Sequence, residues 1–119
     1  MHPALLSNSE KADMKEYNVR ITESALEDME QIYFYIENVL LSPENAKGQY
    51  DRIADKILRL GIFPKKYQVV EIEPFHSKGL RRMPVDNYSV FYIIDNKEVI
   101  VTNVIYSSSD FIVRLKNDF

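Results

Sequence analysis

Basic side chains are concentrated in one stretch of a chain that is acidic overall. The stretch contains Lys65, Lys66, Lys78, Arg81 and Arg82, against Glu71 and Glu73. The formal net charge of −3 argues against a protein that coats nucleic acid over its whole surface. Two interpretations of the basic stretch stay open. It is either a solvated surface, as charged residues usually are, or a contact for an acidic partner.

Other residue types that do chemistry are scarce. The chain has no cysteine, which excludes disulfides and thiolate metal sites. Its two histidines, His2 and His76, lie far apart in the sequence, and no expected helix carries a pair of ligands at metal spacing. We therefore expect neither a metal nor another cofactor.

The length of 119 residues corresponds to one domain with a single core. No apolar run approaches the roughly 20 residues that span a bilayer. The first residues, MHPALLSNSEKAD, have no basic n-region and are not a secretory signal. We expect a flexible tail over 1–13, a single domain over 14–119, no membrane partner and a cytoplasmic location.

The first half of the domain is expected to form a strand and two helices. Residues 17–21 alternate apolar and polar side chains, as a half-buried strand does. Thr22 is a suitable N-cap for a helix over 23–41, and a Ser-Pro-Glu sequence begins a second helix over 43–60. The short connection requires an antiparallel hairpin. Its apolar face should pack on a sheet through Met29, Ile32, Ile36, Tyr50, Ile53 and Ile57.

The second half shows strand patterns. Strands are expected over 67–72, 81–85, 88–94 and 98–106, followed by a short helix over 111–115. Pro84 favours an edge or irregular position, and the run over 88–94, apolar on both faces, favours a central strand. The predicted order is β-α-α-β-β-β-β, an α+β fold whose mostly antiparallel sheet carries a helical hairpin on one face.

Several short motifs occur at matching places in this order. They are Tyr-x-Val-x-Ile at 17–21, Tyr35-Ile36-Glu37, the run from Ala46 to Pro64, LRRMPVDNYSVFY at 80–92, and Tyr106 with Asp110. Together they make the chain similar to the RelE/ParE toxins of type II toxin–antitoxin systems over roughly residues 14–112. The long second helix looks like that of the ParE branch.

This resemblance implies a function that periodicity cannot reveal. Members of the RelE branch enter the ribosomal A site and cut mRNA, whereas members of the ParE branch inhibit DNA gyrase. Both are neutralised by a cognate antitoxin, and the complex usually represses its own operon. The resemblance therefore implies an antitoxin partner and either gyrase or the ribosome with its mRNA as target.

RNA cleavage requires cationic groups that converge on one phosphate. The resemblance implies three places for them, and Arg82 stands where the RelE branch has a catalytic lysine, with Arg81 beside it. The other two places hold Ser89 and Ser109 instead of basic residues. Arginine binds phosphate well but is too basic to transfer protons readily. The ribonuclease constellation is thus mostly missing.

Weaker catalytic candidates are His76, as a general acid or base, and Tyr88, which with Tyr92 and Tyr106 could stack on bases or protonate a leaving group. Against this, His76 is expected in a loop with no role, and the tyrosines in the sheet. The expected partner-binding residues are Arg81, Arg82, Lys78, Lys65, Lys66, Ser109 and Asp110.

The leading hypothesis is therefore a ParE-like toxin that acts by binding DNA gyrase rather than by catalysis. One alternative is a RelE-like, ribosome-dependent mRNA endonuclease with a rearranged site. Another is a non-toxic module of the same fold that binds antitoxin and regulates the operon. The oligomeric state, homodimer or toxin–antitoxin hetero-oligomer, stays open.

Overall fold

A computed structural model describes residues 17–118, so the tail expected over 1–13 lies outside the described part of the chain. The elements follow one another as β1 (Asn18–Ile21), α2 (Glu23–Phe34), η2 (Tyr35–Val39), α3 (Pro43–Leu58), η3 (Arg59–Gly61), η4 (Pro64–Lys66), β2 (Arg81–Val85), β3 (Tyr88–Asp95), β4 (Glu98–Tyr106) and α4 (Phe111–Asp118). Within this part, no helix has the length and apolar character needed to cross a membrane.

The sheet has four strands in the order β1-β4-β3-β2. β1 runs parallel to β4, and the other two pairings are antiparallel. The order confirms that β3 is an inner strand and that Pro84 lies in an edge strand, β2. The predicted α+β class and mostly antiparallel sheet are therefore correct.

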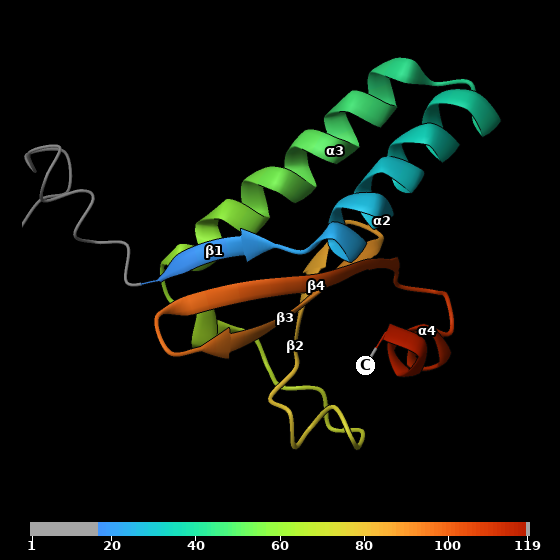
Figure 1. Cartoon of the computed structure of the whole chain (residues 1–119). Coiled ribbons are helices and arrows are strands. Elements are labelled where there is room, and N and C mark those ends of the chain that lie inside the picture. Colours follow the sequence, from blue (N-terminus) through green and yellow to red (C-terminus); the bar gives the residue numbers. More distant parts are fainter. Residues whose placement is uncertain (1–16, 119) are drawn as a thin grey trace, which may run out of the picture.

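Each face of the sheet has its own apolar core. The helical hairpin of α2 and α3 covers one face, where Met29, Ile53 and Ile57 meet the sheet side chains Val90 and Tyr92. On the other face, α4 and the loop before β2 bury Phe75, Phe91 and Leu115 (Figure 1). This double cover explains why β3 is apolar on both sides.

The first helix changes its winding near its end. Thr22 caps it as expected, with its hydroxyl accepting a hydrogen bond from the Ala25 N–H. After Phe34 the chain continues as a π-helix over Tyr35–Val39, which the sequence pattern did not predict. Beyond this segment, Leu41 has a positive φ of 53° and turns the chain toward α3.

The expected strand over 67–72 is wrong. Only an isolated antiparallel bridge forms, between Val69 and Arg81. It is held by hydrogen bonds from Val70 N to Leu80 O and from Arg82 N to Gln68 O. In this register residues 79 and 78 would face residues 71 and 72, but they belong to a run of turns over 73–79, so the pairing does not continue.

One buried carboxylate joins three elements of the fold. β1 pairs with β4 only as far as Val101, which leaves the edge of β4 open beyond that point. There Asp28 of α2, 3% exposed, accepts a hydrogen bond from the Val104 N–H at 2.9 Å. Its other oxygen accepts from Arg114 of α4. A single side chain thus closes the strand edge and fixes α4 to α2.

We predict that Asp28→Asn lowers the free energy of unfolding by about 2 kcal/mol, the range of hydrogen bonds to charged groups. The asparagine amide oxygen can accept a hydrogen bond from either the Val104 N–H or Arg114. The amide NH2, itself a donor, then faces the other donor and cannot accept from it. Urea denaturation measures the loss. Glu27→Gln, the same change at an exposed neighbouring position, is the control. Equal midpoints for the two variants would contradict a role for Asp28 as a clamp.

Candidate functional site

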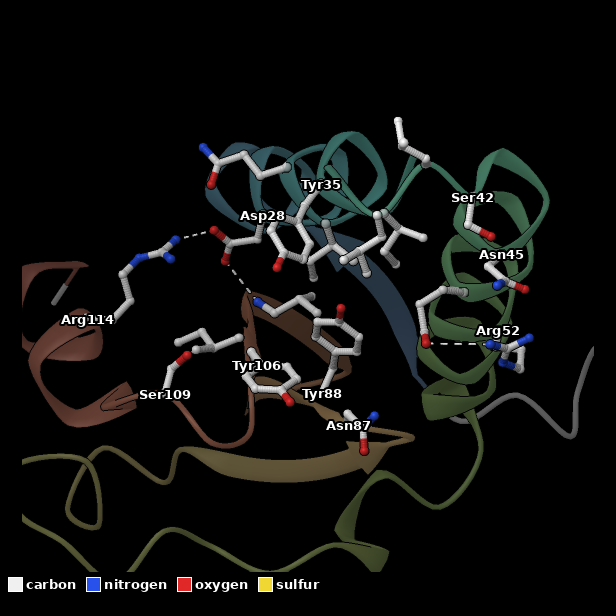
Figure 2. A pocket seen from close by; sticks show the side chains of 18 residues that line it. Asp28, Tyr35, Ser42, Asn45, Arg52, Asn87, Tyr88, Tyr106, Ser109 and Arg114 are labelled. Carbon is white, nitrogen blue, oxygen red and sulfur yellow. Dashed lines mark hydrogen bonds and ion pairs between the residues drawn. The ribbon is translucent and has the colours of Figure 1, made fainter. Parts of the chain in front are cut away.

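A large groove lies between the helical hairpin and the ends of β3 and β4. Its volume is about 1110 Å³. The lining side chains come from the hairpin, the two strands and the residues around α4, as Figure 2 shows. A groove of this volume, lined along the hairpin, is suited to an extended or helical peptide.

Three tyrosines form the middle of the groove. Tyr88 and Tyr106 contact each other edge to face, with ring centroids 5.5 Å apart, and Tyr35 comes from the π-helix opposite (Figure 2). Burial, followed by the neighbouring Tyr106 and Tyr35, raises the pKa of the Tyr88 hydroxyl. Tyr88 therefore stays neutral, and the cluster offers apolar rings with hydroxyls at their tips.

The rest of the groove wall is apolar and open to solvent. Leu40 and Leu41, at the turn of the hairpin, are 56% and 80% exposed, and Tyr35 and Tyr106 are about half exposed. Large apolar side chains grouped in this way usually mark a protein interaction site. The groove therefore has the character of a docking surface.

Two arginines stand at separate places along the groove. Arg114 lies at the α4 side, bound to Asp28. Arg52 of α3 lies at the other side, where its Nε donates to Asp86 at 2.8 Å, and Gln49 donates to the same carboxylate oxygen at 3.0 Å. These hydrogen bonds, with that of Arg52 the larger effect, lower the pKa of Asp86. They hold the β2–β3 turn against α3.

The two adjacent arginines do not converge. Arg81 donates from Nη1 to the carbonyl oxygens of Lys65 and Tyr67, at 3.2 and 2.5 Å. Arg82 points to the opposite face, where its Nε donates to the Ser89 hydroxyl at 2.8 Å and its guanidinium lies over the Phe111 ring. Alternation along β2 causes this separation, because successive side chains of a strand point to opposite faces.

The two serines at the other expected positions are also apart. Ser89 is buried and shares a hydrogen bond with the Ser107 hydroxyl at 2.8 Å, on the Arg82 face. Ser109 instead lines the groove. Ser89 and Ser109 therefore do not face a common point with Arg81.

The remaining expected residues are spread over the surface. His76 and Lys78 lie in the loop before β2, Lys65 and Lys66 in η4, and Asp110 just before α4, all of them exposed. Tyr92 is fully buried and donates to the Pro64 carbonyl at 2.5 Å, so it has a structural role. Within residues 17–118, no group of three or more His, Asp or Glu could hold a metal ion.

Sequence reasoning missed most of the groove. Of the expected site residues, Tyr88 and Ser109 line it, together with Tyr106 of the tyrosines considered. Tyr35 was noted only as part of a motif, and Arg52, Asp28 and Arg114 were not singled out. A signal was available in Leu40 and Leu41, two large apolar residues at a helix turn where polar ones are expected.

Comparison with known proteins identifies the relatives of this chain. A family profile described as the ParE toxin of the type II toxin–antitoxin system parDE matches residues 19–111. A search of curated proteins gives no match.

Solved structures share the fold. The chromosomal ParDE toxin–antitoxin system of P. aeruginosa has a TM-score of 0.65 and 19% identity, covering 77% of this chain and 97% of that one. The RelBE2 complex of Mycobacterium tuberculosis has a TM-score of 0.56 and 19% identity, covering 81% and 97%. The archaeal RelE–RelB complex of Pyrococcus horikoshii has a TM-score of 0.53 and 17% identity, covering 78% and 97%.

The hydrogen bonds from Arg52 and Gln49 to Asp86 predict that the stability of the fold depends on pH. Since the pKa of Asp86 is lowered in the folded state, its contribution to stability is fully present above the unfolded value of about 3.9. The contribution is lost as the pH falls toward the folded-state value. Asp86→Asn removes this titration, and asparagine tolerates the positive φ of 54° at this position. The difference in unfolding free energy between wild type and Asp86→Asn should shrink from pH 6 to pH 3. A difference independent of pH would contradict the contact.

Proposed function

Because this chain belongs to the ParE toxin family of type II toxin–antitoxin systems, we propose that it inhibits growth by binding DNA gyrase and is neutralised by an antitoxin held in the groove. The family membership carries the role of toxin. Binding of gyrase and neutralisation by an antitoxin are the proposed steps beyond it.

The separation of Arg81 and Arg82 supports binding rather than cleavage. Catalysis at a phosphate needs several cationic groups aimed at one point. Here one arginine holds the backbone of residues 65–67 and the other is held by Ser89 and Phe111, on opposite faces of β2. Gathering them on one phosphate would break these contacts and cost free energy in addition to that of the reaction.

The groove supports the antitoxin partner. Its exposed leucines and tyrosines would receive the apolar side chains of a peptide. The similar ParDE and RelBE2 structures are of toxin–antitoxin systems, and the similar RelE–RelB structure is of a complex, which is consistent with such a partner.

The groove predicts a specific effect of one tyrosine. Tyr35→Ala should weaken binding of the proposed antitoxin by at least about tenfold, because aromatic anchors dominate peptide interfaces. Phe34→Ala is the matched control, since Phe34 is 63% exposed and adjacent but does not line the groove. Titration calorimetry gives both affinities. Equal losses for the two variants would remove the groove from the interface.

Induction of the toxin without its partner tests the mechanism. DNA synthesis should stop first while protein synthesis continues, and purified gyrase should be inhibited directly. Codon-phased mRNA ends in the ribosomal A site would overturn this proposal in favour of the endonuclease. Normal growth with intact antitoxin binding would instead favour the non-toxic regulatory module.

A further inference from the structure

A second hollow lies between the residue before β1 and the η4 segment. Figure 1 shows that β1 begins at the end of the sheet away from α4. The hollow is lined by Tyr17, Phe63, Pro64, Lys65 and Lys66 and has a volume of about 510 Å³. We call it the lysine–aromatic hollow. None of its residues lines the groove between the hairpin and the strands, so it is a separate site.

Phe63 is held in an unusual conformation. Its φ and ψ of 53° and 52° are left-handed, which is rare for a bulky residue and occurs here directly before a proline. The phenyl ring gains little burial in exchange, since it is 68% exposed. Strain of this kind, combined with an exposed ring, is characteristic of a side chain presented to a partner.

The backbone beneath the hollow is rigid. Arg81 donates to the carbonyl oxygens of Lys65 and Tyr67, and the buried Tyr92 hydroxyl donates to that of Pro64. Burial raises the pKa of Tyr92, so this hydroxyl keeps its proton. Two inward side chains of the sheet therefore fix the segment that carries Phe63 and the two lysines.

Three ammonium groups surround the hollow. Lys65 and Lys66 are exposed on it, with the Lys66 Nζ 5.4 Å from the Tyr67 ring centroid. Lys97, in the β3–β4 turn, is also exposed, and its Nζ lies 5.3 Å from the Tyr17 ring centroid. The nearby Glu98 is engaged by Arg20 at 3.3 Å. The hollow is therefore positively charged in a chain of net charge −3.

We propose that the lysine–aromatic hollow binds a segment of single-stranded nucleic acid. An unpaired base would stack on Phe63, and the adjoining phosphates would bind Lys65, Lys66 and Lys97. The volume is suited to one nucleotide. An acidic peptide would use the lysines but leave the strained, exposed Phe63 ring without a role, so the nucleic acid fits the side chains better. This site is distinct from the groove and independent of the proposed gyrase and antitoxin binding.

Fluorescence anisotropy of the full chain with a labelled 12-nucleotide oligo(dT) tests the proposal. Binding should weaken steeply with salt, because each lysine contact releases counterions. Lys65→Gln with Lys66→Gln should weaken binding about tenfold or more, whereas Lys116→Gln on α4, an exposed lysine far from the hollow, should leave it unchanged. An equal loss for Lys116→Gln would show unspecific charge attraction and overturn the proposal.

Variants of Phe63 separate stacking from charge. Phe63→Tyr keeps the ring and should retain binding, whereas Phe63→Leu keeps an apolar side chain and should weaken binding about tenfold, the usual effect of losing one stacked base. Thermal unfolding establishes that each variant is folded before its affinity is compared. Equal affinities of the two variants, or full competition by poly-glutamate, would overturn the proposal in favour of a site for acidic peptides.

Discussion

The arrangement of this protein depends on the buried carboxylate of Asp28. The parallel strand β1 covers only the first part of β4, so the backbone of β4 beyond Val101 needs another partner. Asp28 supplies it through the Val104 N–H and at the same time binds Arg114. A buried charge without such partners would be strongly destabilising. Asp28 therefore adds a polar link among α2, β4 and α4 to the apolar contacts of the two cores.

The groove is a consequence of the same arrangement. α2 begins beside β1 and contacts β4, and in Figure 1 the far end of the hairpin extends away from the sheet. Tyr35 has regular helical backbone angles and lies on the same helix face as Asp28 and Ile32, which places it in the groove with Tyr88 and Tyr106. The π-helix begins at Tyr35 and leads to the exposed Leu40 and Leu41. π-Helical segments often occur at functional sites.

Charge alone is a poor guide to the function of this protein. Four of the five basic residues between Lys65 and Arg82 fall into three groups with different roles. Arg81 supports a loop, Arg82 lies between a serine and an aromatic ring, and the lysines of η4 remain exposed at the surface. An arginine donates in a rigid planar fork and suits such internal bridging, whereas a flexible lysine leaves its ammonium in solvent. The exposed lysines are consequently the ones available to a partner.

The sequence by itself determined the α+β class, the helical hairpin, the edge position of Pro84 and the central strand from Tyr88, because hydrophobic periodicity, caps and prolines act over a few residues. It also pointed to the toxin family through short motifs at matching places. Only the tertiary structure decided that 67–72 is not a strand, because residues 78 and 79, which would face 72 and 71, lie in the turns over 73–79. It also decided that Tyr35, Tyr88 and Tyr106 share one groove and that Arg81 and Arg82 do not share a site. Such contacts join residues far apart in the chain, and no local pattern encodes them.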